Sequence, residues 1–79
     1  MTPQQDQELR QVVAQSLGAK LSAIVDDAEF VDDLCADTLD RLELTLAIED
    51  TFGIAIDDDE AGQIVTVGDL VSLVKRKLR

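Results

Sequence analysis

The sequence lacks most of the side chains on which catalysis and nucleic-acid binding depend. Its 79 residues include no histidine, tryptophan or tyrosine, two phenylalanines, one cysteine and one proline. Histidine is the commonest general base and metal ligand, and aromatic rings are the surfaces on which nucleic-acid bases stack. A chain this short also buries too little surface for a deep catalytic cleft. We therefore expect one domain, residues 1–79, that is not an enzyme.

Positive charge is also scarce. Seven Lys and Arg face seventeen Asp and Glu, which gives a formal net charge of −10, and residues 26–60 hold fourteen of the carboxylates with one cation, Arg41. Such a surface repels nucleic-acid phosphates and anionic membranes and attracts basic protein surfaces. We expect protein partners with basic surfaces and no nucleic acid. Four of the cations form a basic tail: Lys75, Arg76, Lys77 and Arg79.

Long apolar runs and paired cysteines are missing as well. No apolar run approaches the roughly 18 residues that span a bilayer, so we expect no membrane insertion. The single Cys35 cannot form an internal disulfide, and the N-terminus has neither the basic nor the apolar region of a signal peptide. These features favour a cytoplasmic monomer.

The residues that are present predict an all-α fold. Apolar side chains recur at helical spacing in several segments, and Thr2, Asp37 and Thr66 stand where they can cap the first turn of a helix. The acidic run 57–60 opens a further short helix, which Gly62 weakens by about 1 kcal/mol relative to alanine. The predicted helices run from about Pro3 to Leu17, Thr38 to Phe52, Asp57 to Ile64 and Val67 to Leu78.

A long segment without helical period, residues 18–36, separates the first two predicted helices. Loops of this length are usually functional or packed by their own side chains. We expect scattered apolar residues to pin the loop to the core, namely Leu21, Ile24, Phe30, Val31 and Leu34.

The second predicted helix carries two apolar stripes. At about 100° per residue, Leu44, Ala47 and Ile48 share one arc. A second stripe lies more than a quarter turn away and is bordered by carboxylates, which is typical of a docking surface. The alternative is a central helix that is buried nearly all round. The second stripe and its border comprise Leu39, Leu42, Leu46, Glu43, Glu49 and Asp50.

The segment from Phe30 to Asp40 resembles the prosthetic-group attachment site of acyl carrier proteins, whose pattern reads Asp-Ser-Leu where this chain has Asp37-Thr38-Leu39. The resemblance covers nearly the whole chain, because further family motifs follow in the same order. It implies a four-helix bundle with a long loop between the first two helices and a short third helix. The further motifs are Leu42-Glu43-Leu44, Ala47-Ile48-Glu49, Phe52-Gly53-Ile54 and Thr66-Val67-Gly68-Asp69.

The resemblance also implies a function. Thr38, flanked by Asp37 and Leu39, would bear covalent 4'-phosphopantetheine, which carries an acyl or related group as a thioester to fatty-acid or related biosynthetic enzymes. The implied partners are a phosphopantetheinyl transferase and acyl-processing enzymes, and the second helix is their recognition helix. The implied partner-facing residues are Asp40, Leu42, Glu43, Leu46, Glu49 and Asp50.

Two positions depart from the family pattern. Thr38 replaces serine, and Cys35 stands where the family usually has glycine. The threonine methyl group crowds the hydroxyl and restricts its rotamer, so we expect slower modification. Three hypotheses stay open: a modified carrier, an unmodified carrier-like interaction or regulatory protein that docks to the same enzymes, and a variant whose attachment serine was replaced.

Other chemistry is weakly indicated. We expect Cys35 to be a small, partly buried loop residue, because neighbouring carboxylates would blunt the reactivity of a thiol there. The acidic run 57–60 lacks the alternating ligands and glycine of a calcium-binding loop, so no metal site is expected. A hydrolase built on Thr38 or Cys35 would have no general base beyond carboxylates.

Overall fold

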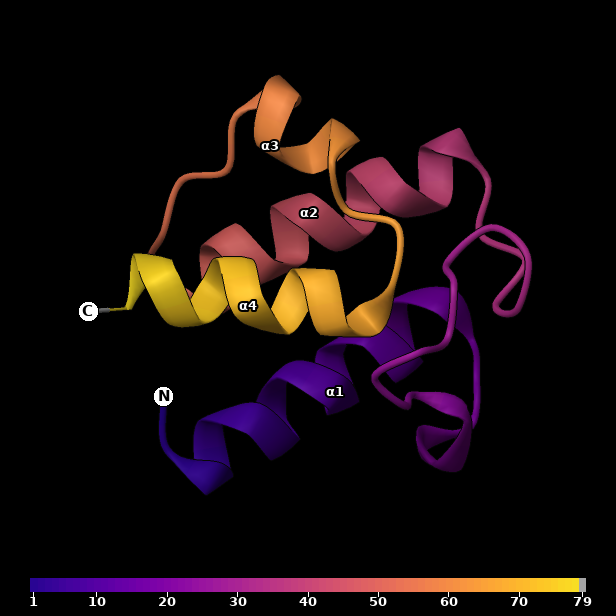
Figure 1. Cartoon of the computed structure of the whole chain (residues 1–79), viewed down its shortest axis with the longest axis horizontal. Helices are drawn as coiled ribbons and strands as arrows, with labels where there is room; N and C mark the ends of the chain where they lie inside the picture. Colours follow the sequence, from indigo (N-terminus) through magenta and orange to yellow (C-terminus); the bar gives the residue numbers. More distant parts are fainter. Residues whose placement is uncertain (79) are drawn as a thin grey trace.

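The computed structural model describes residues 1–78 and contains four α-helices (Figure 1). A long loop connects the first helix to the second. The all-α class is confirmed, and Arg79 of the basic tail lies outside the described residues. The first two helices have the predicted bounds, whereas the third is shorter because Asp57 is its cap and it ends at Gly62. The helices are α1 (Pro3–Leu17), α2 (Thr38–Phe52), α3 (Asp58–Gly62) and α4 (Val67–Lys77).

A capping box closes the start of every one of these helices. In each, the side chain before the helix accepts a hydrogen bond from the third helical N–H, and the third side chain bonds back. The backbone N–H groups of Thr66 and Val65 thereby lower the pKa of Asp69. A hydrogen bond from the Lys77 side chain lowers the pKa of Glu60, and a second hydrogen bond from Asp57 N–H acts in the same direction. The cap pairs are Thr2 with Gln5, Asp37 with Asp40, Asp57 with Glu60, and Thr66 with Asp69.

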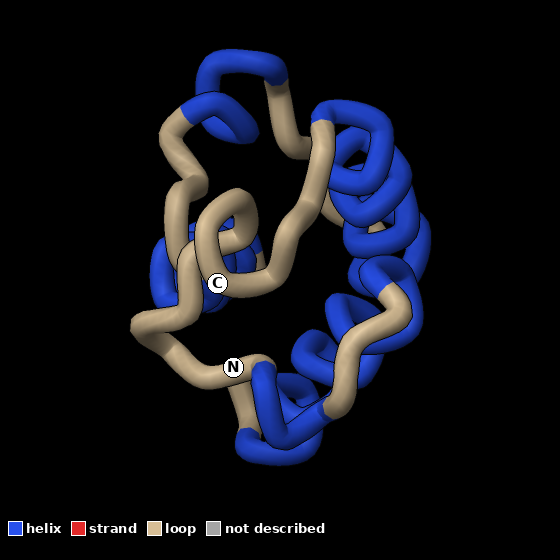
Figure 2. The backbone as a smooth tube through the Cα atoms, turned by 90° about the vertical axis from the view of Figure 1, so that its right-hand side faces the viewer, coloured by secondary structure: helices blue, strands red, loops and turns tan. Residues whose placement is uncertain are grey.

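The core forms where α1, α2, α4 and the first loop meet. In Figure 2, which views the chain from the side, the helices and the loop surround the region that the core side chains fill. All side chains of the core are aliphatic except Phe30, and they include Ile56, which follows α2. Its least exposed side chains are Phe30, Leu9, Ile48, Leu70, Val13, Val67 and Val74.

Backbone hydrogen bonds hold the first loop against the start of α4. Phe30 N–H donates to the Val65 carbonyl at 3.0 Å, and Gly68 N–H donates to the Asp26 carbonyl at 2.8 Å. A Cβ at position 68 would lie 3.0 Å from that Asp26 oxygen, so this close approach favours glycine. The loop is therefore fixed by contacts with residues far along the chain.

The prediction that five apolar residues pin this loop is confirmed in part. Ile24 and Phe30 are buried, and Leu34 packs against the core. Leu21 and Val31 are 45% and 57% exposed, so the prediction was wrong for them. No local period fixes which side chains of a loop face inward; here the long-range backbone bonds decide it.

Candidate functional site

Thr38 is the first residue of α2, and its side chain is exposed. The preceding Asp37 accepts a hydrogen bond from Asp40 N–H at 2.8 Å, and Asp37 N–H donates to the Asp40 carboxylate at 3.1 Å. These two bonds fix the first turn of the helix. The Thr38 hydroxyl takes no part in them: it is open to solvent and has no hydrogen bond to another group within residues 1–78.

The chain reverses direction just before this helix. Cys35 has φ of 56°, in the left-handed region, and Ala36 is buried with its N–H donating to the Phe30 carbonyl at 2.8 Å. The Cys35 thiol is free and exposed, so the prediction of a partly buried residue was wrong. The reversal that buries Ala36 turns its neighbour outward. A left-handed residue also fits a position where the resemblance expects glycine.

The two stripes of α2 have different surroundings. Leu44 and Ile48 are 5% and 0% exposed, and Ala47 is half-buried. The second stripe is open to solvent along the helix, which rules out burial all round. We call it the apolar ridge; it consists of Leu39, Leu42 and Leu46, which are 60%, 56% and 56% exposed.

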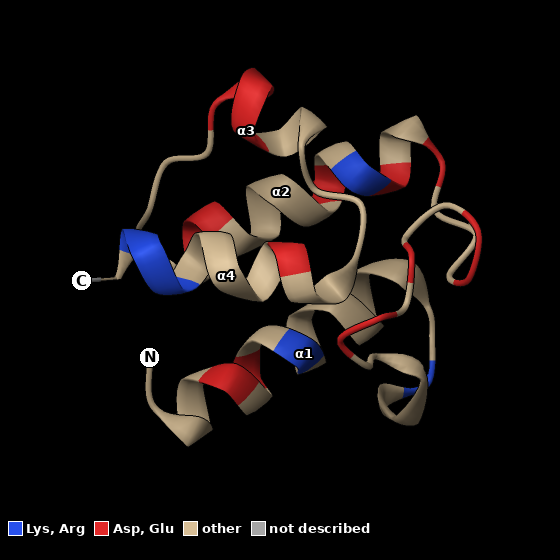
Figure 3. Ribbon diagram, viewed as in Figure 1, with Lys and Arg blue, Asp and Glu red and all other residues tan. Residues whose placement is uncertain are grey.

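Carboxylates of two kinds border the apolar ridge. Glu43 and Asp50 are exposed, whereas Asp40 belongs to the α2 cap. Glu49 is half-buried and accepts a hydrogen bond from Ile56 N–H at 2.9 Å, so this carboxylate also holds the connection that follows α2. Helical spacing gives no signal for that role, because the donor lies beyond the helix. Figure 3 shows the acidic residues spread over α2, α3 and the first loop, and basic residues at the end of α4.

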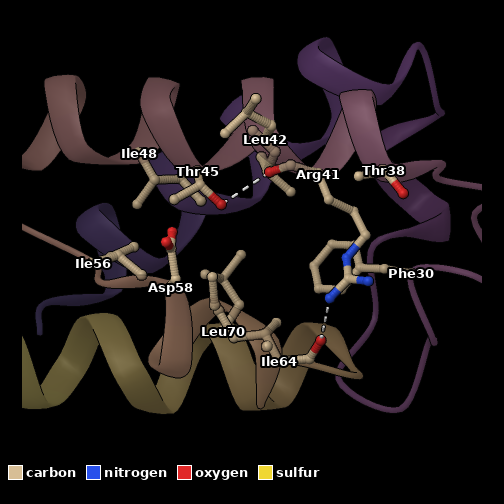
Figure 4. A pocket seen from close by; sticks show the side chains of 13 residues that line it. Phe30, Thr38, Arg41, Leu42, Thr45, Ile48, Ile56, Asp58, Ile64 and Leu70 are labelled. Carbon is tan, nitrogen blue, oxygen red and sulfur yellow. Dashed lines mark hydrogen bonds between the residues drawn. The ribbon is translucent and has the colours of Figure 1, made fainter.

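An apolar cavity of about 200 Å³ opens beside Thr38. Figure 4 shows side chains of α2 along one side of it, with Phe30, Ile56, Ile64 and Leu70 around the remainder. Spacing along the sequence could not reveal this cavity, because segments far apart in the chain enclose it. Its polar lining residues are Thr38, Arg41, Thr45 and Asp58.

Residues 1–78 contain no group of three or more His, Cys, Asp or Glu side chains placed to hold a metal ion. The acidic run before and within α3 instead supplies the cap of that helix through Asp57 and Glu60. None of the described helices has the length and apolar character needed to cross a bilayer.

Comparison with known proteins identifies relatives of this fold. A family model described as the phosphopantetheine attachment site matches residues 7–74. A structure from Mycobacterium tuberculosis, assigned as an acyl carrier protein, is 31% identical and covers 90% of this chain and 95% of its own, with a TM-score of 0.84. The acyl carrier protein from Enterococcus faecalis is 29% identical and covers 98% of this chain and 99% of its own, with a TM-score of 0.79.

Proposed function

Because the chain belongs to the phosphopantetheine attachment site family, whose members are carriers and not enzymes, we propose that Thr38 is its attachment residue. The cofactor of this family is covalent 4'-phosphopantetheine. The observation that carries the proposal is the exposed Thr38 side chain at the edge of the apolar cavity. When bound, the group supplies a terminal thiol that holds an acyl group as a thioester.

The residues around Thr38 fit such a group. The bonds between Asp37 and Asp40 hold the start of α2 in place, and Leu39 presents an apolar contact beside the hydroxyl. In transfer from coenzyme A, the hydroxyl oxygen would form the new bond to phosphorus as its proton leaves, and the diphosphate bond of coenzyme A would break to release the nucleotide half. The threonine methyl would slow that step by restricting the rotamers that expose the oxygen.

The cavity is the proposed shelter of the acyl group. An apolar cavity of about 150 Å³ admits a molecule the size of benzene, so about 200 Å³ accommodates a group of roughly eight carbon atoms. Most of the lining is apolar, which favours an alkyl chain of fatty-acid or related biosynthesis.

The apolar ridge and its border are the proposed docking surface. Phosphopantetheinyl transferase and acyl-processing enzymes with basic surfaces would be attracted at long range by Glu43 and Asp50 and would contact the ridge on docking. Asp40 and Glu49 add negative charge while holding the α2 cap and the α2–α3 connection. The exposed Cys35 thiol suits a reducing cytoplasm, where it stays unpaired.

A second function, docking without a carried group, is favoured by one observation, the threonine at position 38. Incubation with a broad-specificity transferase and coenzyme A, followed by intact mass measurement, separates the two. We expect the native chain to gain the phosphopantetheine mass slowly and Thr38→Ser to gain it quickly. A gain in Thr38→Ser alone would exclude the carrier role for this chain and leave the docking role.

The same assay tests the docking surface. In the Thr38→Ser background, Glu43→Lys should slow modification severalfold at low salt, because it reverses a charge on the docking surface. Glu8→Lys, an equal charge change at an exposed site on α1, should have little effect. Equal rates for the two reversals would show that overall charge, and not this surface, guides the transferase.

A further inference from the structure

Arg41 stands apart from the other cations of this chain. It is the one Lys or Arg between residues 21 and 74, it lies three residues after Thr38 on α2, and it lines the same cavity. Its Nη2 atom donates to the Ile64 carbonyl at 3.3 Å, which is a long hydrogen bond. Figure 4 shows the guanidinium beside Phe30, at the end of the cavity where Thr38 lies.

No carboxylate within residues 1–78 forms an ion pair with this guanidinium. Arg10, which is also half-buried, does form ion pairs, with Asp6 at 2.7 Å and with Asp26 at 2.5 Å. The exposed Lys77 pairs with Glu60 at 2.9 Å. An arginine has several N–H donors in a planar fork, and most of those on Arg41 are uncommitted. A partly buried arginine in so acidic a chain is therefore left available for an external acceptor.

A cation of this kind would stabilise a phosphodiester on Thr38. The negative charge of the phosphodiester would lie beside the carboxylates of Asp37 and Asp40, and the cap already occupies the backbone N–H groups of those two residues. Residues three apart are neighbours on a helix surface, about 4.5 Å apart along the axis, and long side chains lean toward the N-terminal turn. Arg41 therefore lies within reach of an oxygen attached to the Thr38 hydroxyl.

We propose that Arg41 binds the phosphodiester of the prosthetic group and holds the base of the arm against the mouth of the cavity. The guanidinium would exchange its long bond to the Ile64 carbonyl for charge-assisted hydrogen bonds to phosphate oxygens, which are stronger. This inference rests on the proposed function. It assigns Arg41 a positioning role for the cofactor and no role in chemistry.

A cycle of unfolding measurements tests the proposal. Apo and modified forms of Thr38→Ser are compared by urea denaturation, with and without Arg41→Gln. Loss of the Ile64 bond alone would change both forms equally and cancel in the difference. Loss of a phosphate contact should lower the folding equilibrium constant of the modified form roughly 3- to 10-fold more than that of the apo form. Arg41→Lys should restore part of the difference, since lysine keeps the charge without the planar fork.

The control and a second readout complete the design. Arg10→Gln removes an α1 cation that pairs with Asp6 and with Asp26 of the first loop. This variant should leave the difference in stability between the modified and apo forms unchanged. The phosphorus NMR signal of the folded, modified protein should shift in Arg41→Gln and stay in place in Arg10→Gln. A modified protein with an unchanged difference and an unshifted signal in Arg41→Gln would overturn this inference alone. Failure of Thr38→Ser to gain mass would overturn the proposed function together with it.

Discussion

Residues around the proposed attachment position affect different properties of the chain. A threonine at the first position of α2 is compatible with the helix, because the cap is made by Asp37 and Asp40 and not by residue 38. Its added methyl group acts on the reactivity of the hydroxyl. We therefore expect a threonine instead of a serine at position 38 to affect the rate of modification more than the stability of the fold.

Cys35 bears on stability instead. A side chain with φ of 56° costs about 1–2 kcal/mol relative to the right-handed region, and glycine avoids that cost. Part of the gain is offset by the greater freedom of glycine in the unfolded chain, about 0.4–1 kcal/mol. We expect Cys35→Gly to raise the free energy of unfolding by up to about 1.6 kcal/mol, measured by urea denaturation under reducing conditions.

Cys35→Ala is the matched control for that measurement. Alanine keeps the Cβ that causes the strain, so its stability should stay close to that of the native chain. An equal gain for alanine and glycine would show that removal of the thiol, and not the backbone conformation, is responsible.

At the scale of the element, α2 divides its side chains between two tasks. Leu44 and Ile48 pack into the core, while the apolar ridge stays exposed along the same helix. A helix in a small bundle needs one buried face for stability. The exposed apolar side chains therefore add little to folding, and they are the surface proposed above for docking.

Two substitutions on α2 measure this division. Ile48→Ala removes a fully buried side chain and should lower the free energy of unfolding by about 2–5 kcal/mol. Leu46→Ala, on a residue that is 56% exposed, should change it by about 0.5 kcal/mol or less. Urea denaturation of both variants checks the pair. A loss of more than about 2 kcal/mol for Leu46→Ala would mean that the ridge supports the fold.

At the scale of the whole molecule, the main feature is the excess of negative charge. A net charge of −10 is concentrated in a chain with extents of 30 × 26 × 19 Å. The screening length of salt is about 30 Å at 0.01 M and about 8 Å at 0.15 M. Carboxylates across the molecule therefore repel one another at low salt and are largely screened from one another at physiological salt.

This repulsion predicts a salt-dependent melting temperature. Raising the salt concentration from about 0.01 to 0.15 M should increase the melting temperature by several degrees, because about 1 kcal/mol corresponds to 4–8 °C in a domain of this size. Thermal unfolding followed by circular dichroism measures it. Sodium and choline chlorides should act alike if screening is the cause; a rise with sodium alone would point to specific ion binding.

Local patterns were sufficient to predict the helices and the position of Thr38. Caps and helical periods involve residues within about four positions of each other, so Asp37, Gly53 and the two stripes of α2 could be interpreted from the sequence alone. The family motifs depend on order and spacing, which the sequence also contains.

Tertiary structure decided the exposure of the Cys35 thiol, the hydrogen bond that Ile56 N–H donates to Glu49, the cavity and the availability of Arg41. Each depends on residues that are distant along the chain or on the path of an irregular loop, and neither leaves a period in the sequence. The sequence by itself determined which segments are helices and that α2 begins with a hydroxyl-bearing residue, Thr38. Only packing decided which side chains form the cavity beside that hydroxyl, because Phe30, Ile56 and Leu70 meet α2 through the folding of the whole chain.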